Sequence, residues 1–185
     1  MFGEFQLTNS GELGGWTLKM QSAKKLPQDV ASAYTEVFGE PRVGAKYIPI
    51  YYVADQLVNG SNHKLISERE KMVSGGKIIK DFAITTINIP LGTVGGKGAT
   101  KVSETDSTDF ILRDEVETGF KKAVAEFTSA AFTPIMELGT QVTKGTDYHF
   151  LCETKPNYSN EIYLTRVVIN NFNDAWSIVE IEKLS

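Results

Sequence analysis

The sequence predicts an α+β fold of two tandem units, each with one helix packed on an antiparallel sheet. Two observations lead to this prediction: the chain repeats itself at a spacing of about 85 residues, and each half has one helical pattern followed by several strand patterns. A helix grouped with antiparallel strands is typical of the α+β class. With 185 residues, the chain is long enough for two small units.

The repeat is clearest in two ten-residue segments that align without a gap. Residues 56–65 read QLVNGSNHKL, and residues 141–150 read QVTKGTDYHF. The same spacing pairs Pro49 with Pro134, and a Gly-Gly pair precedes the motif in each half. A repeat of this length is too long for a solenoid and suits a small domain. We therefore expect a first unit over residues 1–93 and a second over 94–185, with a linker rich in Gly, Ser and Thr at 91–107.

One amphipathic helix is expected in each half, over residues 27–38 and 114–127. Pro27 suits a first helical turn, and Asp114 is favoured at a helix N-terminus by the helix dipole. In both segments the apolar residues recur at helical spacing: Val30, Tyr34, Val37 and Phe38 in the first, and Val116, Phe120, Ala123, Val124 and Phe127 in the second.

Strands are expected where β-branched and aromatic residues cluster between turn signals. Ser74-Gly75-Gly76 predicts a hairpin turn between two of them. The last strand of the first unit has no clear source: either residues 98–111 or the N-terminal residues 2–7 supply it. The expected strands are residues 47–56, 63–73, 78–89, 134–141, 148–153, 161–170 and 176–183.

Composition excludes several classes of partner. The net charge is −4 and the pI is about 5.3, which argues against a nucleic-acid partner because no basic patch stands out. The densest basic stretch, Lys19 to Lys25, is expected to be the solvated start of a helix. No apolar run is long enough to cross a bilayer, so no membrane partner is expected. The first residues lack a secretory signal, which predicts a cytoplasmic protein; a secreted protein with its leader removed is the alternative.

The sequence offers no support for an enzyme. Cys152, the single cysteine, and His149 lie three apart on an expected strand, so their side chains should point to opposite faces. Two histidines and one cysteine lack metal-ligand spacing, and the glycines of residues 92–98 have no following Lys-Ser/Thr pair for phosphate. We expect no catalytic residue, no metal and no cofactor.

A Gly-Gly pair, one helix, and Q-x-V-x-G at the next hairpin turn resemble the cystatin family, repeated in tandem. Gln56-Leu57-Val58-Asn59-Gly60 matches the motif fully. Gln141-Val142-Thr143-Lys144-Gly145 has Thr143 where the motif has Val, and its continuation resembles the stefin branch. Trp176 follows Ala175 where secreted cystatins carry Pro-Trp, and the matching stretch of the first unit, Ile89–Gly92, has no Trp.

The resemblance implies reversible inhibition of papain-like cysteine proteases, with the Gly-Gly segment and the hairpin loops forming a wedge that blocks the cleft. The residues implied to bind the protease are Gly14, Gly15, Gln56, Leu57, Val58, Asn59, Gly60, Gln141, Val142, Thr143, Lys144, Gly145 and Trp176. Because its motif is intact, the first unit is expected to be the more active. Gly60→Glu should then weaken protease binding with little change in melting temperature, provided the turn is exposed and Glu tolerates its backbone φ.

Two alternatives remain open from the sequence. Each Q-x-V-x-G turn is also consistent with a plain hairpin whose glycine relieves backbone strain, and Trp176 with a partly buried strand residue. The protein as a whole is also consistent with a non-inhibitory binding or scaffold protein, because a fold does not determine an activity.

Overall fold

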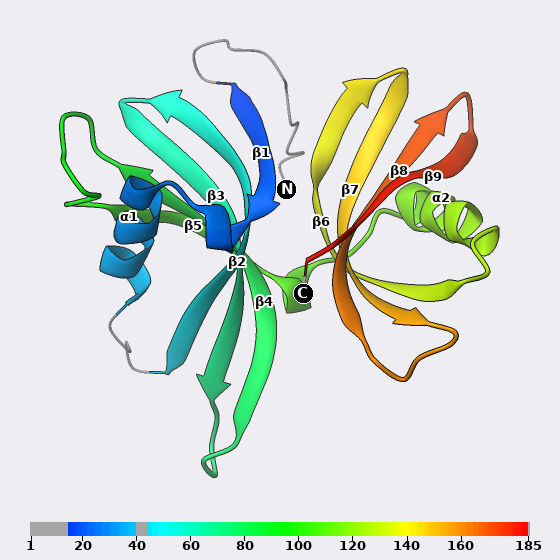
Figure 1. The fold of residues 1–185 in the computed structure, drawn as a ribbon, viewed down its shortest axis with the longest axis horizontal. Helices are drawn as coiled ribbons and strands as arrows, with labels where there is room; N and C mark the ends of the chain where they lie inside the picture. The colour runs from blue at the N-terminus through cyan, green and yellow to red at the C-terminus, as the bar shows by residue number, and fades with distance from the viewer. Residues whose placement is uncertain (1–14, 40–43, 185) are drawn as a thin grey trace. The chain divides into compact units, whose positions relative to one another are not determined.

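The computed structural model describes residues 15–39 and 44–184 (Figure 1). In this part of the chain there are nine strands, two α-helices and two short 3-10 turns. In chain order the helices and strands are β1 (Trp16–Ser22), α1 (Gln28–Phe38), β2 (Ala45–Val58), β3 (Gly60–Met72), β4 (Ile78–Ile89), β5 (Thr100–Asp106), α2 (Asp114–Ala125), β6 (Ala130–Thr143), β7 (Gly145–Pro156), β8 (Tyr163–Phe172) and β9 (Ala175–Lys183).

The predicted α+β class with two tandem cystatin-like, helix-on-sheet units is wrong, because the chain is mostly β. Strand accounts for 57% of the structure and helix for 17%, and the strands form two antiparallel sheets. The physical reason for this difference is that the strands are long compared with the helices. β2 and β3 continue through the turn motif as strands of 14 and 13 residues, whereas α1 and α2 have 11 and 12 residues.

The described chain divides into two compact units, the first ending at Asp109 and the second beginning at Phe110. The first sheet has the strand order β1-β2-β3-β4-β5, and the second β6-β7-β8-β9. The linker expected at residues 91–107 needs correction. Thr100–Asp106 forms β5, which pairs with β4 as the last strand of the first sheet. The basic stretch from Lys19 also differs from expectation, since it continues β1 before a 3-10 turn at Ala23–Lys25.

The two long hairpins repeat each other in register. In the β2–β3 pair Gln56 lies opposite Asn62, and in the β6–β7 pair Gln141 lies opposite Asp147, so both partners are shifted by 85 residues (141 − 56 and 147 − 62). Irregularities in the pairing fall at matching places, after Pro49 in β2 and after Pro134 in β6. The sequence repeat is thus a repeat of hairpin geometry.

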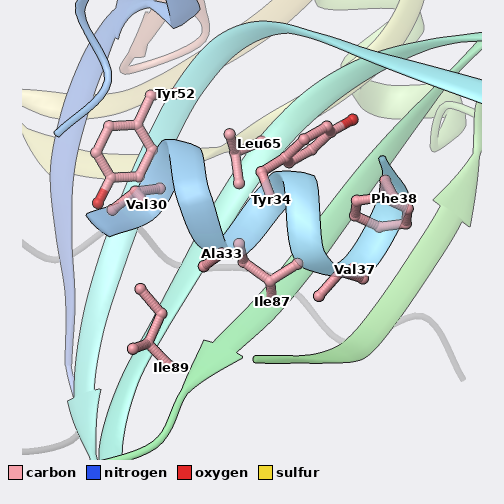
Figure 2. Close-up of a cluster of buried hydrophobic side chains, with 9 residues drawn as sticks. All are labelled: Val30, Ala33, Tyr34, Val37, Phe38, Tyr52, Leu65, Ile87 and Ile89. Atoms are coloured by element: carbon pink, nitrogen blue, oxygen red, sulfur yellow. The ribbon is translucent and has the colours of Figure 1, made fainter. Parts of the chain in front are cut away.

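In the first unit the buried stripe of α1 packs on one face of the sheet (Figure 2). Tyr34 places its hydroxyl 2.7 Å from the Ser67 hydroxyl, so its polar end is satisfied inside the core. The buried cluster comprises Val30, Ala33, Tyr34, Val37 and Phe38 of α1 with Tyr52, Leu65, Ile87 and Ile89 of the sheet. The residues expected on the apolar stripe of this helix are therefore buried.

The second unit has its own apolar cluster. Phe120 of α2 meets Phe150 of β7 edge-on, with ring centroids 5.1 Å apart. The helix ends at Ala125, so Phe127, expected within it, lies outside. The buried members are Val116, Phe120, Ala123, Phe150, Cys152, Val167 and Ile169.

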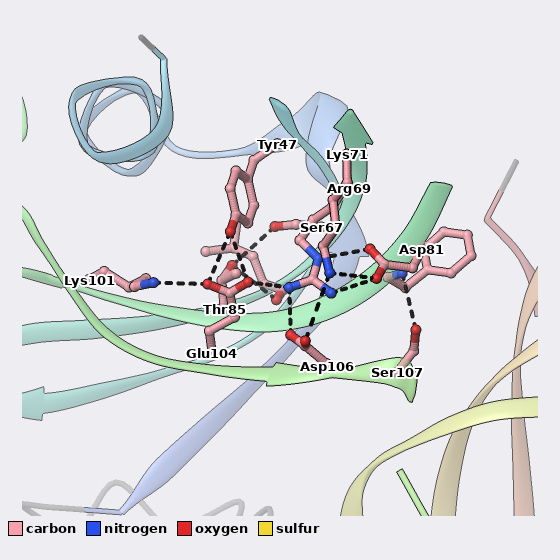
Figure 3. A network of polar contacts seen from close by, with 12 residues as sticks. Tyr47, Ser67, Arg69, Lys71, Asp81, Thr85, Lys101, Glu104, Asp106 and Ser107 are labelled. Atoms are coloured by element: carbon pink, nitrogen blue, oxygen red, sulfur yellow. Dashed lines mark hydrogen bonds and ion pairs between the residues drawn. The ribbon is translucent and has the colours of Figure 1, made fainter. Parts of the chain in front are cut away.

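Beside the core of the first unit, Arg69 of β3 is buried among three carboxylates (Figure 3). Its guanidinium donates to Asp81 of β4 at 2.7 and 2.8 Å and also bonds Glu104 and Asp106 of β5. Tyr47 of β2 donates to Glu104 at 2.9 Å. This carboxylate cluster ties β5 to β3 and β4 through side chains, although most residues of β5 are exposed.

Acid should destabilise the first unit through this cluster. Burial on its own would raise the pKa of Asp81, but hydrogen bonds from Arg69 and Lys71 hold that pKa below its usual value. The pKa of Glu104 is likewise lowered, because hydrogen bonds from Lys101, Tyr47 and Arg69 outweigh its burial. A carboxylate with a lowered folded-state pKa stabilises the fold above its unfolded pKa of about 4 and loses that effect as the pH falls through the folded value.

We therefore expect the urea midpoint of the first unit to fall as the pH decreases from about 5 to about 2. Hydrogen exchange of the β4 and β5 amides at each pH identifies the part that opens. A midpoint that stays constant over this range would contradict the role given to the cluster.

Candidate protein-binding site

Three segments named by the sequence motifs meet at one end of the first sheet. β1 begins with Trp16 opposite Gln56, next to the β2–β3 turn, so Gly15 lies at this end of the sheet. Ser61, just after the turn, pairs with Ile89, the last residue of β4. The connection from β4 to β5 therefore starts beside the turn. We call residues 57–60 and 90–99 together the loop edge. Gly14 lies outside the described residues.

Gly60 allows the backbones of the two parts of the loop edge to approach closely. Its φ of +102° favours glycine, and a Cβ at this position would overlap the carbonyl oxygen of Ile89 and lie 3.1 Å from the Pro90 Cα. The condition set for Gly60→Glu, that Glu tolerates the φ at this position, is therefore not met, and this variant is expected to lower the melting temperature. Any side chain here would push apart two backbone segments.

The loop edge exposes large apolar side chains. Leu57 is 67% exposed, Leu91 79% and Val94 84%, and Val58 beside them is also exposed. Isolated surface leucines are common, but a group on two adjoining loops is typical of a surface that binds a partner. Asn59 lies exposed between Val58 and Gly60 at the tip of the turn.

The β4–β5 loop is attached to α1 rather than free. Gly96 is buried against the helix, and a Cβ there would lie 2.5 Å from the Ala33 nitrogen. The backbone N–H of Gly98 donates to Glu36 of α1 at 2.8 Å. Within the loop, the Thr93 hydroxyl donates to the Pro90 carbonyl at 2.9 Å. Leu91 and Val94 are thus presented from a loop that is held at both ends.

Hydrogen-bonded polar residues support the turn from the sheet. The Asn62 amide donates to the Gln56 side chain at 3.0 Å, and Asn88 donates in turn to Asn62 at 2.9 Å. Gln56, the first residue of the motif, is half-buried and so braces the turn rather than projecting from it. On the helix side, His63 lies between the hydroxyls of Tyr52 and Ser61 at 2.7 and 2.8 Å. Burial, the main cause, lowers the pKa of His63.

Leu91 and Val94 are absent from the binding residues that the resemblance implies, although it matched Ile89–Gly92 to a hairpin loop of the cystatins. The motif marks only the turn, whereas the approach of the β4–β5 loop depends on the register of three strands. The signal available in the sequence is the density of glycines at 92, 95, 96 and 98, which also suits a linker.

The corresponding turn of the second unit has the same backbone but a more polar surface. Gly145 has a φ of +101°, and a Cβ there would overlap the Asn171 carbonyl oxygen. Val142 is 75% exposed, Thr143 and Lys144 are exposed, and Gln141 is half-buried. The Lys144 ammonium lies 5.1 Å from the Phe172 ring centre. The side chain of Asn170 donates to Thr143, Lys144 and Asp147 at 3.4, 3.2 and 2.6 Å.

Trp176, the second residue of β9, packs against α2. It is half-buried, its ring fills the space over Gly119 of α2, and it lies 5.4 Å from the Tyr148 ring. A Cβ on Gly119 would overlap the indole, so this glycine allows the helix and the ring to pack closely. The packing favours the structural interpretation of Trp176, while its role in protease binding stays a prediction.

Cys152 and His149 do not form a nucleophile and base. Cys152 belongs to the apolar cluster under α2, and burial raises the pKa of its thiol. Burial and, next, the positive charge of Arg166 lower the pKa of His149 to about 4. Its Nδ1 lies 3.1 Å from the Arg166 guanidinium, so the buried imidazole is neutral at pH 7.

Among the described residues, no group of three or more His, Cys, Asp or Glu side chains is arranged to hold a metal ion. In the same part of the chain, neither helix has the length and apolar character needed to cross a membrane.

A scan against protein-family models finds no match for the chain, and a search of curated proteins finds none either. The resemblance to the cystatins therefore stays a prediction based on the motifs.

Proposed function

We propose that the first unit inhibits papain-like cysteine proteases reversibly, by inserting the loop edge into the substrate cleft. The observation that carries this proposal is the joining of two exposed apolar loops at Gly60, which makes one continuous edge from the Q-x-V-x-G turn and the β4–β5 loop. A narrow edge of this kind suits a groove that normally accepts an extended chain.

The chemistry of the loop edge supports an apolar cleft as its partner. From Leu57 to Gly60 and from Pro90 to Gly96 it carries no charged residue; Lys97 is the first. Burying an unpaired charge is costly, so this uncharged part of the loop edge can enter a cleft and exclude water without that penalty. Most of the binding energy should come from a few central apolar side chains, here Leu57, Val58 and Leu91.

The attachment of the loop to α1 also supports this proposal. A segment that is already held in its bound shape loses little conformational entropy when it docks. Gly96 against Ala33, and the bond from Gly98 to Glu36, fix the loop before any partner arrives. The loop edge blocks the cleft without reacting, so the inhibitor should remain uncleaved.

A matched pair of substitutions tests the proposal on the full chain. Leu57→Asp and Val142→Asp change equivalent exposed positions, since Leu57 pairs with Ser61 in β2–β3 and Val142 with Thr146 in β6–β7. We expect Leu57→Asp to weaken inhibition of papain by at least about tenfold, because an apolar cleft must desolvate the new carboxylate. Val142→Asp should change it little, because the second turn is more polar.

Inhibition constants with active-site-titrated papain, recovery of activity on dilution and the intact mass of the inhibitor give the readout. Melting temperatures of both variants control for unfolding. If the parent fails to inhibit several papain-like enzymes at tens of micromolar, a binding free energy of about −6 to −7 kcal/mol is not reached and the proposal is wrong. Equal inhibition by the parent and Leu57→Asp would assign the activity to another surface.

A further inference from the structure

The turn in the loop edge carries a chemically reactive pair of residues, Asn59-Gly60, which is the one Asn-Gly pair in the sequence. The side-chain amide of an asparagine can react with the backbone nitrogen of the residue that follows it. A side chain on that following residue hinders the reaction, and glycine has none. Asn59 is therefore a candidate for spontaneous modification, provided that the fold leaves its amide accessible.

The fold does leave this amide accessible. Val58 and Gly60 form the last pair of the β2–β3 ladder, so Asn59 lies outside the ladder. Asn59 is exposed, and its side chain makes no hydrogen bond within residues 15–39 and 44–184. The side chains of Asn62 and Asn88, in contrast, donate hydrogen bonds inside the sheet at 3.0 and 2.9 Å. Of these three asparagines, Asn59 alone has both a glycine after it and an unrestrained amide.

The second unit shows that the turn does not require asparagine. At the spacing of 85 residues that relates the two hairpins, Lys144 corresponds to Asn59 (144 − 59) and also precedes a glycine. The two glycines have nearly the same backbone, with a φ of +102° for Gly60 and +101° for Gly145. The same turn is thus built once with a residue that can react with the next backbone nitrogen and once with a residue that cannot.

We propose that Asn59 deamidates spontaneously and that this reaction limits the lifetime of the loop edge as a binding surface. The Gly60 backbone nitrogen, after losing its proton to a base in the solvent, attacks Cγ of Asn59. A C–N bond forms, and the side-chain nitrogen leaves as ammonia, which produces a cyclic succinimide. Water then opens the ring. Cleavage of the bond to Cγ gives aspartate, and cleavage of the bond to the backbone carbonyl carbon gives isoaspartate. The net reaction consumes one water and releases one ammonia.

Either product would change the loop edge, and this part of the proposal rests on the proposed function. The loop edge has no charged residue from 57 to 60 or from 90 to 96, and both products place a carboxylate at its tip. An apolar cleft would have to desolvate this carboxylate, which is costly. Isoaspartate also adds a carbon to the backbone beside Gly60, where the turn lies close to the Ile89 carbonyl oxygen. Deamidation should therefore weaken inhibition.

Mass spectrometry of the full chain tests the reaction itself. The chain is incubated in mildly alkaline buffer beside a synthetic peptide of residues 54–65, in which no fold restrains Asn59. We expect Asn59 of the folded chain to react within about tenfold of the rate in the peptide, because an exposed turn needs little local opening. The products are heavier by about 1 Da, and methylation by an isoaspartyl methyltransferase with S-adenosylmethionine labels the isoaspartate.

Asn160 is the internal control for this measurement. It is also exposed, but Glu161 follows it, and the Glu161 backbone N–H already donates to the Ser159 hydroxyl at 3.0 Å. Asn160 should stay unchanged during the incubation.

Two substitutions connect the reaction with inhibition of papain. Asn59→Asp, one of the two products, should inhibit at least about tenfold more weakly than the parent. Asn59→Gln cannot form the succinimide, so its inhibition constant, whatever the starting value, should stay constant during the incubation. Inhibition by the parent should weaken in step with the loss of the Asn59 amide. Melting temperatures show whether both variants are folded.

The outcomes separate this proposal from the proposed function. An intact Asn59 after the peptide has lost its amide would overturn the proposal, because the fold would then protect the residue. Deamidation with an unchanged inhibition constant would overturn the limit on the lifetime of the loop edge. If the parent does not inhibit papain, the proposed function is wrong and that limit falls with it, while the mass measurement still decides whether Asn59 reacts.

Discussion

Replacing Arg69 by methionine should lower the free energy of unfolding of the first unit by about 3–5 kcal/mol, because removing one partner of a buried ionic cluster leaves the others uncompensated. The guanidinium bonds Asp81, Glu104 and Asp106 together, and its side chain is 3% exposed. Methionine fills a similar volume, so the loss should come from the stranded carboxylates rather than from a cavity. Urea unfolding at pH 7 measures the effect.

Lys80→Met provides the control for the loss of a charge. Lys80 bridges Glu68 and Glu70 on the exposed surface of the same hairpin, at 3.3 and 3.0 Å, where solvent screens the interaction. This variant should unfold almost as the parent does. The Arg69→Met variant should also recover part of its stability at pH 3 to 4, since protonation removes the unpaired charges. A loss below about 1 kcal/mol for Arg69→Met would mean that the cluster contributes little.

The positions of the helices followed from the sequence because their signal is local. Apolar residues at helical spacing put Val30, Tyr34 and Val37 on a buried stripe, and each of them is buried. The strand Ile78–Ile89 was also predicted with its observed bounds, since turn residues mark both of its ends.

Two strands of the first sheet could not be recognised in this way, because tertiary contacts form them. β5 reads TKVSETD and has one large apolar residue, Val102, which is exposed. What holds β5 is its ladder with β4 and the bonds of Glu104 and Asp106 to Arg69. β1 contains basic residues that, by composition, suit the start of a helix. Residues 98–111 were one of the two sources named for the last strand of the first unit, and β5 lies within them. Without its bounds, and without β1, the fold class and the linker at 91–107 were wrong.

Only the turn of the candidate site could be predicted from the sequence, because only its signal is local. The Q-x-V-x-G motif is local and located the turn at Gly60. The partner loop with Leu91 and Val94 reaches the turn only because Ser61 pairs with Ile89, a contact that spans 28 residues of sequence (89 − 61). Without the register, the glycines at 95 and 96 suggest a flexible connection. In the structure Gly96 is buried against α1.

Gly60→Ala should both destabilise the first unit and abolish inhibition by the loop edge. The positive φ of +102° costs an alanine about 1–2 kcal/mol, and its Cβ would also overlap the Ile89 carbonyl oxygen. Relieving an overlap of this kind typically costs a further ~1–3 kcal/mol, so we expect a total loss of about 2–5 kcal/mol in unfolding free energy. The relief must separate the turn from Pro90, which breaks the continuity of the loop edge.

Gly75→Ala is the matched control, because Gly75 has a φ of +84° in the β3–β4 turn, at the other end of β3, but a Cβ added there would meet no atom within 4 Å. It should cost only the conformational part, about 1–2 kcal/mol, and leave papain inhibition unchanged. Chemical unfolding and inhibition constants of the parent and both variants separate the cost of the positive φ from the cost of the overlap with Ile89. Equal effects of Gly60→Ala and Gly75→Ala on both measurements would show that the contact between Gly60 and Ile89 neither stabilises the unit nor shapes its binding edge.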